Sequence, residues 1–283
     1  MKLVVDSGST KTDWGFFNTE YDLKAIKTQG INPCHQSIDA IRTIINSELI
    51  SNASADDINS VTELFYYGAG CATPSICAQM AGILKEFFPD AAIAVDSDML
   101  GAARALCGHA EGVACVLGTG SNSCLYNGVE IVDQVPSLGY ILGDEGSGAA
   151  LGRRFIGDCL KRQMPDAVSK EFMERYSLDK DIIIENVYRQ PLPNRYIAGF
   201  VPFIHEKRTV PEVHKMLIQC FSEFFTRNVI NYHKPWLPVH FVGSLAGIFA
   251  DELKETADSL GMTIGKIMAS PMSGLVEYYG QQS

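Results

Sequence analysis

The stretch Asp6-Ser7-Gly8-Ser9-Thr10-Lys11-Thr12-Asp13 decides the fold of this chain. It joins a β-branched run at residues 2–5 to a second strand-like run at residues 14–18. Small residues let such a turn bend sharply and bring its backbone close to a ligand. Its amides and the hydroxyls of Ser9 and Thr10 can then donate hydrogen bonds to phosphate oxygens.

Two charged residues of this turn extend the phosphate interpretation. Asp6 stands at the end of the first strand, where its carboxylate can hold hydrated Mg²⁺. Lys11 can offset phosphate charge, and Gly8 allows the close approach of the backbone. An ordinary polar hairpin with a solvated aspartate is the alternative interpretation, because short glycine-rich matches are common.

The first half of the chain alternates between strand-like and helix-like patterns. The predicted order is βββαβαβα, which indicates an α/β lobe with a mixed sheet. The expected strands cover residues 2–5, 14–18, 24–28, 63–67 and 92–95, and the expected helices cover residues 36–49, 74–88 and 99–106.

The second half opens with the same pattern. A buried-strand run at 113–117 leads into the turn Gly118-Thr119-Gly120, and Asn127-Gly128 predicts a two-residue hairpin between strands at 123–126 and 129–132. We therefore expect two related lobes, at residues 1–108 and 109–283, with the last helix a candidate to return to the first lobe. The remaining predicted elements are a mostly helical region at 147–233 that ends in a long helix at 210–233, strands at 239–242 and 263–268, and helices at 245–259 and 274–279.

Three further segments hold candidate site residues. The turn with Gly243, Ser244 and Gly247 suits the close approach of an adenosine group, or is a plain turn with a packing glycine. Asp96 and Asp98 end a strand beside a helix start, so one of them is a candidate base for phosphoryl transfer. Asp144 lies in a polar turn before another helix, where it could accept hydrogen bonds from sugar hydroxyls or cap the helix.

Composition excludes several classes of function. The formal net charge is −10 without a basic cluster, which argues against nucleic acid and acidic lipid as partners. No apolar run reaches 18 residues, and residues 3–5 are too short for a signal sequence, so we expect a cytoplasmic protein. The eight cysteines form no CxxC pair and are expected to be reduced core thiols. The GxxxxGK[ST] motif of P-loop enzymes is absent.

Together, the three glycine-rich turns resemble those of the sugar kinase/Hsp70/actin superfamily. Segments 10–12 (TKT), 118–122 (GTGSN) and 143–147 (GDEGS) are most similar to the BadF/BadG/BcrA/BcrD-type ATPase family, which contains N-acetylglucosamine kinase. The resemblance covers nearly the whole chain in motif order. It implies an actin-like ATPase fold, in which two ribonuclease H-like lobes with a central nucleotide cleft close over ATP·Mg²⁺ and a sugar.

The resemblance also implies roles for single residues. The family's catalytic base opens a helix in an Asp-x-x-Gly segment, which Asp98 to Gly101 matches, so Asp98 is favoured over Asp96. The family's sugar contacts include an asparagine shortly after a glycine and the aspartate of the GDEG turn. Asn32 and Asp144 match these two positions, so the resemblance implies that both bind the sugar. Asn122 and Thr119 stand where the family approaches sugar and phosphate.

The function implied is phosphorylation of an amino sugar by ATP, with N-acetylglucosamine giving the 6-phosphate and Asp98 taking the hydroxyl proton. Mg²⁺ is the expected cofactor, anchored by Asp6 through water, and a homodimer is a family expectation. An ATPase that activates an iron–sulfur electron-transfer or dehydratase partner is the alternative.

Overall fold

The computed structural model describes residues 1–8, 10–18 and 22–280. Contacts divide the chain into two units. Unit 1 comprises Met1–Ala110, the short segment Gly128–Ile131 and the C-terminal segment from Ser270 onward, and unit 2 comprises Glu111–Asn127 and Val132–Ala269.

Unit 1 is built on a mixed five-stranded sheet in the order β3-β2-β1-β4-β5. The strands β1, β2 and β3 form an antiparallel meander, and β4 and β5 continue from β1 in parallel. Leu3 and Val5 face one core while Val4 faces the other, because successive residues of a strand point to opposite faces. The bounds are β1 Lys2–Ser7, β2 Lys11–Phe17, β3 Leu23–Gln29, β4 Glu63–Gly68 and β5 Ala92–Ser97.

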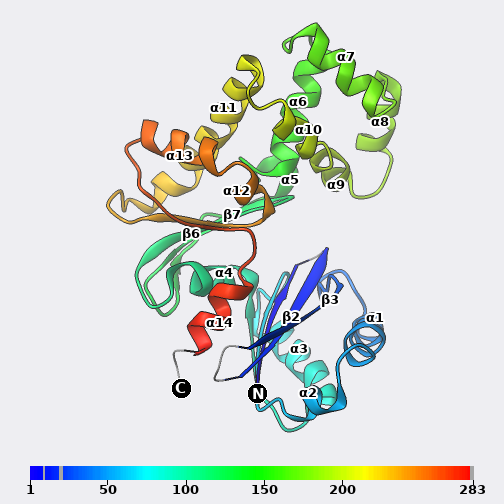
Figure 1. The fold of residues 1–283 in the computed structure, drawn as a ribbon, viewed down its shortest axis with the longest axis vertical. Helices are drawn as coiled ribbons and strands as arrows, with labels where there is room; N and C mark the ends of the chain where they lie inside the picture. The colour runs from blue at the N-terminus through cyan, green and yellow to red at the C-terminus, as the bar shows by residue number, and fades with distance from the viewer. Residues whose placement is uncertain (9, 19–21, 281–283) are drawn as a thin grey trace. The chain divides into compact units, whose positions relative to one another are not determined.

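Helices cover both faces of this sheet (Figure 1). One core contains side chains of α1 (Ile38–Ile44), its π-helical continuation η1 (Ile45–Ile50) and α3 (Pro74–Phe87), with the short α2 (Ala55–Asn59) in the following connection. The other core contains α4 (Asp98–Cys107) and α14 (Met272–Gly280). The predicted strand and helix order of this half is confirmed.

The last helix, α14, is tied to unit 1 by a polar cluster. Arg104 on α4 donates from Nη1 to the hydroxyls of Tyr67 (2.6 Å) and Tyr279 (3.1 Å), and these two hydroxyls also hydrogen-bond each other. Gly274 packs directly on the backbone of α4, since a Cβ there would lie 2.3 Å from the carbonyl oxygen of Ala105.

Unit 2 repeats the strand connectivity of unit 1. Its sheet has the order β10-β9-β6-β7-β8. In both sheets the first strand in the sequence is central, the next two strands lie on one side of it, and the last two lie on the other. The strands β6 and β7 are antiparallel, whereas β6, β9 and β10 are parallel. The bounds are β6 Gly112–Leu117, β7 Ser121–Tyr126, β8 Ile131–Asp133, β9 Val239–Val242 and β10 Ile264–Met268.

Aromatic side chains dominate the core of unit 2, where α6 and α11 meet the sheet. Phe155, Phe224 and Phe241 are fully buried in one continuous cluster. The two-lobed mixed α/β fold predicted from the sequence is confirmed. The helices are α5 Gly139–Leu142, α6 Gly148–Leu160, α7 Asp166–Arg175, α8 Lys180–Tyr188, α9 Pro193–Ala198, α10 Val201–Glu206, α11 Pro211–Arg227, the 3₁₀ turn η2 Val229–Tyr232, α12 Ser244–Ile248 and α13 Ala250–Ser259.

Three local predictions differ from the structure. The hairpin turn is not two residues long, because β7 ends at Tyr126 and β8 begins at Ile131. Gly128 is explained instead by its φ of +95° and by packing, since a Cβ there would lie 2.4 Å from the carbonyl oxygen of His109. The helix predicted at 210–233 ends at Arg227, and that predicted at 245–259 is broken at the buried Phe249.

Among the residues that the structure describes, no helix is long and apolar enough to cross a membrane.

The close packing of α14 predicts a strong effect of a single methyl group. Gly274→Ala should lower the free energy of unfolding by about 1–3 kcal/mol, because the added Cβ overlaps the backbone of α4. Gly82→Ala in the exposed face of α3 is the control, since no atom lies within 4 Å of its Cβ position. That control should be neutral or stabilising by up to about 1 kcal/mol. Urea unfolding measures both, and equal effects would refute the packing account.

Candidate active site

Aspartates gather at one edge of the unit 1 sheet. Asp6 is the penultimate residue of β1 and is paired with Asp13 of β2 across the antiparallel ladder. Asp98 begins α4 directly after β5. Because β1, β4 and β5 are parallel, their carboxyl ends meet at this edge, where open α/β sheets bind ligands.

The start of α4 explains how Asp98 is presented. Ser97 caps the helix by accepting a hydrogen bond from the Leu100 amide at 3.2 Å, which leaves Asp98 in the first turn. Gly101 lets the helix lie against β4, because a Cβ there would be 2.6 Å from the ring of Tyr67. The Asp-x-x-Gly spacing thus has a packing reason of its own. The Asp96 carboxylate instead lies 4.0 Å from Arg104 Nη1, and Arg104 also contacts Tyr279 of α14.

The pKa values of these carboxyls are displaced upward. Burial, followed by the charges of Asp13 and Asp98, raises the pKa of Asp6 to about 7 against the opposing effect of Lys11. Asp98 keeps surface accessible to solvent. Protein packed around its carboxylate nevertheless raises its pKa by desolvation, and the Met99 amide opposes this by donating at 2.9 Å. Such crowded carboxylates are costly without a positive partner.

Asp13 is a site residue that the sequence analysis missed. It is 5% exposed, and its Oδ2 forms an ion pair with Lys11 Nζ at 2.7 Å. Its Oδ1 is buried and has no hydrogen-bond partner among the described groups. The available signal was an acidic residue directly before the apolar run Trp14 to Phe17, but its register against Asp6 could not be read from the sequence.

This donor set fits a divalent cation. Mg²⁺ prefers carboxylate oxygens and keeps several of its waters, and Asp13 Oδ1 is an unpaired acceptor next to Asp6. Within residues 1–8, 10–18 and 22–280, no three acidic, histidine or cysteine side chains converge closely enough to coordinate a metal directly. Asp6 and Asp13 are thus the two carboxylates of this edge that could face a hydrated Mg²⁺.

The first predicted phosphate turn is closed by its own backbone. The Gly8 amide donates to the Lys11 carbonyl at 2.9 Å, and the Thr10 carbonyl accepts from Gly30 at 3.1 Å. Thr10 is exposed, whereas Ser9 lies outside the described residues. Lys11, predicted to face phosphate, has its ammonium group on Asp13.

Asn32 lies in the loop after β3. Its Oδ1 accepts from the Cys34 amide at 3.0 Å, and it lies against Gly70, where a Cβ would be only 2.3 Å away. Burial raises the pKa of Cys71 to about 12, with smaller contributions from Asp98 and Cys34. The Cys34 thiol also donates to the Gly70 carbonyl at 3.4 Å, so the Asn32 loop lies against the turn that follows β4, and Gly68 at the end of β4 is paired with Ser97, the residue before Asp98.

In unit 2, Asp144 and the loop 118–121 come together. The Ser121 amide donates to Asp144 Oδ1 at 3.2 Å, and a Cβ on Gly120 would be 2.9 Å from Asp144 Oδ2. The carbonyls of Gly118 and Thr119 accept from the first amides of α6 at 2.8 and 3.1 Å. Asp144 is buried, which raises its pKa.

Asn122 is not brought to the same face as Asp144. Ser121 and Ser123 point toward Glu145 and Tyr232, and a strand alternates its side chains. Asn122 accepts instead from Gln134 Nε2 at 3.1 Å.

The third glycine-rich turn touches the second. Gly243 has a φ of +128°, and a Cβ there would lie 2.1 Å from the carbonyl oxygen of Leu117. Glycine at this position is thus required by the packing of β9 on β6, whatever the turn binds. Ser244 and Gly247 are exposed in the short helix α12 that follows.

A comparison with solved structures decides the family. The chain is 46% identical to a protein of Porphyromonas gingivalis named "Putative N-acetylglucosamine Kinase", with 99% of each chain covered and a TM-score of 0.95. This chain belongs to the N-acetylglucosamine kinase-like family of sugar kinases. The family resemblance seen in the sequence is confirmed.

More distant structures share the fold of this N-acetylglucosamine kinase-like protein. A protein of the same name from Chromobacterium violaceum is 19% identical, with 98% of each chain covered and a TM-score of 0.69. The ROK hexokinase of Thermus thermophilus is 13% identical, with 99% of each chain covered and a TM-score of 0.54. No protein-family model and no curated protein matches the chain.

The raised pKa of Asp6 predicts a pH-dependent stability. A carboxyl with a folded pKa of about 7 and an unfolded pKa of 3.8 stabilises the fold at low pH and loses that contribution as the pH rises to 7. Asp6→Asn should therefore unfold at higher urea than the wild type at pH 8, by about 1–3 kcal/mol after a discount for partial exposure.

This difference should be measured in EDTA and should shrink to near zero at pH 4. Asp22→Asn on the surface is the control. An Asp6→Asn variant that is equally or less stable than the wild type at pH 8 would contradict the electrostatic account.

Proposed function

We propose that this protein transfers the γ-phosphoryl group of ATP to an amino sugar, converting N-acetylglucosamine to its 6-phosphate. One observation carries the proposal: Asp98, with a raised pKa and solvent access, opens α4 at the sheet edge that also holds Asp6 and Asp13. The family membership supports the same reaction.

Asp98 is the general base of the proposed reaction. As the 6-hydroxyl oxygen attacks the γ-phosphorus, its proton passes to the Asp98 carboxylate, and the bond from phosphorus to the bridging oxygen of ADP breaks. A carboxylate whose pKa is shifted upward is the better proton acceptor near neutral pH. Its first-turn position, fixed by the Ser97 cap, keeps the carboxylate in one orientation.

Asp6 and Asp13 are the residues proposed to hold Mg²⁺ through its water shell. When bound, the ion offsets the negative charge of the phosphates. Asp13 also holds the Lys11 ammonium at 2.7 Å, which offsets the charge of one carboxylate at this edge. The turn at 8–10 and the loop 118–120 are the proposed phosphate-binding segments, with Thr119 contributing its hydroxyl. The amides of Gly8 and Gly118 already donate to the carbonyls of Lys11 and Gly120, so we do not count these two amides among the phosphate donors.

Asn32 and Asp144 are the proposed sugar contacts. A carboxylate accepts hydrogen bonds from hydroxyl groups, and Asp144 is fixed by the Ser121 amide. Asn32 is fixed through the Cys34 amide, and its loop lies against the turn after β4, the strand that pairs with β5 immediately before Asp98. The family resemblance implied a sugar contact for Asn122, but its side chain does not share a face with Asp144, so we do not include it among the sugar contacts. Gly243, Ser244 and Gly247 are the proposed adenosine turn.

ADP release from ATP·Mg²⁺ tests this function with a panel of sugars: N-acetylglucosamine, glucosamine, N-acetylmannosamine, N-acetylmuramic acid and glucose. Strong stimulation by N-acetylglucosamine is the expected result. ATP hydrolysis that no sugar changes would refute the proposal and favour an ATPase that acts on a partner protein.

Asp98→Asn should retain sugar binding but lose about 10²- to 10⁴-fold in kcat, because asparagine cannot accept the proton. Asp96→Asn is the matched control, since it removes a neighbouring carboxyl that points toward Arg104. Steady-state kinetics measure both variants. Equal losses in the two, or near-normal turnover of Asp98→Asn, would remove Asp98 from the role of base.

Asp144→Asn should raise the KM for the sugar about 10-fold or more and leave the KM for ATP within about twofold, because a charged hydrogen bond to a hydroxyl is lost. Asn keeps the size of the side chain against Gly120. Equal increases in the two KM values would contradict its assignment as a sugar contact.

A further inference from the structure

We infer that Glu145 is a positioning residue: it anchors the turn 143–146 to the end of α11 and thereby holds Asp144 against the loop 118–121. The inference rests on the proposed sugar contact of Asp144. It gives no substrate contact to Glu145, although this residue is the direct neighbour of Asp144 in the polar turn.

The turn has a backbone that needs support. Asp144 adopts a φ of +54° and Gly146 a φ of +68°, and a side chain makes this left-handed region less favourable than it is for glycine. Gly146 lies directly on α11, because a Cβ there would be 2.9 Å from the Cβ of Phe224. Contacts outside the turn must therefore stabilise this conformation.

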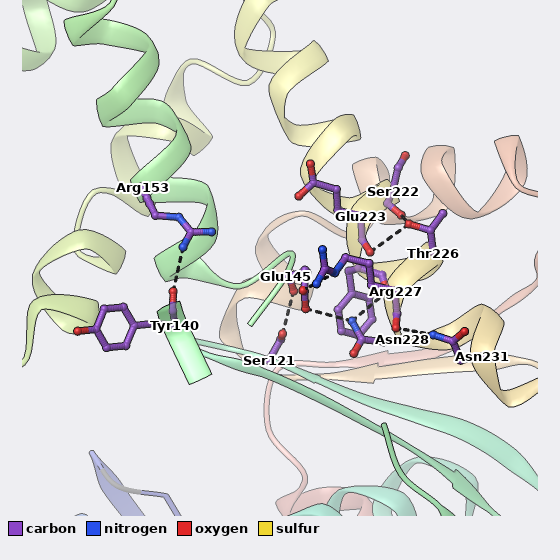
Figure 2. A network of polar contacts seen from close by, with 11 residues as sticks. Ser121, Tyr140, Glu145, Arg153, Ser222, Glu223, Thr226, Arg227, Asn228 and Asn231 are labelled. Carbon is purple, nitrogen blue, oxygen red and sulfur yellow. Dashed lines mark hydrogen bonds and ion pairs between the residues drawn. The ribbon is translucent and has the colours of Figure 1, made fainter. Parts of the chain in front are cut away.

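Glu145 supplies those contacts through its side-chain carboxylate and its backbone carbonyl. Its carboxylate accepts from Arg227 Nε at 2.7 Å and from Asn228 Nδ2 at 3.4 Å. Its backbone carbonyl accepts from Ser121 Oγ at 2.8 Å. Figure 2 shows Glu145 between Ser121 on the sheet and the Arg227–Asn228 pair at the end of α11.

The anchor on α11 is buried at Asn228 and exposed at Arg227. Asn228 is buried and also donates to the Phe224 carbonyl at 3.2 Å, and Phe224 itself is fully buried. Arg227 stands in the last helical turn, where a positive charge interacts favourably with the helix dipole. The Glu145 side chain is 14% exposed, so its ion pair with Arg227 is partly shielded from water.

Ser121 couples this anchor to Asp144. The amide of Ser121 donates to Asp144 Oδ1, while its hydroxyl donates to the carbonyl of Glu145. Asp144 and Glu145 thus use the same residue of β7 from two neighbouring peptide units. With both Arg227 and Asn228 on its carboxylate, Glu145 faces α11, whereas Asp144 faces Gly120.

The test uses the full-length protein with the variants Glu145→Gln and Arg227→Gln, and with the double variant. Each single change should raise the KM for N-acetylglucosamine about 5- to 20-fold, as expected for a weakened charged hydrogen bond, and should leave the KM for ATP within about twofold. The double variant should be no worse than the poorer single variant, because both remove one interaction.

Two further variants control for general effects. Arg189→Gln removes an exposed ion pair with Glu185 in the same unit and should leave every kinetic constant unchanged. Arg227→Lys keeps the positive charge and should restore part of the sugar affinity. Additive losses in the double variant, or equal increases in the KM values for sugar and ATP, would overturn the inference.

Amide hydrogen exchange separates this inference from the proposed function. Peptides that cover residues 143–147 should exchange faster in Glu145→Gln and Arg227→Gln than in the wild type, with the rest of unit 2 unchanged. This result does not depend on any activity. A wild type that phosphorylates no amino sugar refutes the proposed function, whereas unchanged exchange at 143–147 refutes the anchoring role of Glu145. If Glu145→Gln does not fold, Arg227→Gln carries the test.

Discussion

The repulsion among carboxylates at the edge of the unit 1 sheet is the constraint on which the rest of the site depends. Asp6 and Asp13 are paired across the ladder, and burial, with the charges of Asp13 and Asp98 adding to it, raises the pKa of Asp6 to about 7. An apolar or neutral residue at any of these positions would ease folding. The arrangement makes sense when positive charge is supplied, by Lys11 within the chain and by a hydrated cation from solution.

Unit 2 repeats the strand order but replaces acidic crowding with close backbone packing. Gly243 lies on Leu117, Gly120 lies on Asp144, and the loop carbonyls accept from the first amides of α6. A side chain at either glycine would push the loop away from its neighbours. The two units thus share one strand order, with crowded carboxylates at the sheet edge of unit 1 and close backbone packing in the loops of unit 2.

Much of the fold could be predicted because the signals were local. β-branched runs marked the strands, and Pro74 at the first position of α3 and the small residues after β1 and β6 marked the ends of elements. The helix breaks at Asn228 and Phe249 could not be predicted, because tertiary contacts cause them: Asn228 bonds to Glu145, and Phe249 is buried against Phe221.

The candidate site, too, could be predicted where the signal was local in the sequence and not where it depended on tertiary contacts. The Asp-x-x-Gly motif at Asp98 could be read from the sequence, and the structure places Asp98 in the first turn of a helix that Ser97 caps. Asp13 and Glu145 were missed because their importance lies in partners far along the chain or across the ladder, Asp6 for one and Arg227 for the other. The catalytic and ligand-binding roles remain predictions.

The most direct measurement follows the phosphoryl group itself. The protein is incubated with Mg²⁺, N-acetylglucosamine and ATP labelled at the γ-phosphate, and the labelled product is identified by chromatography and phosphorus NMR. The account predicts that the label appears as a monoester on the 6-hydroxyl of the sugar, in amounts equal to the ADP formed. Label found in inorganic phosphate, with none on the sugar, would contradict it.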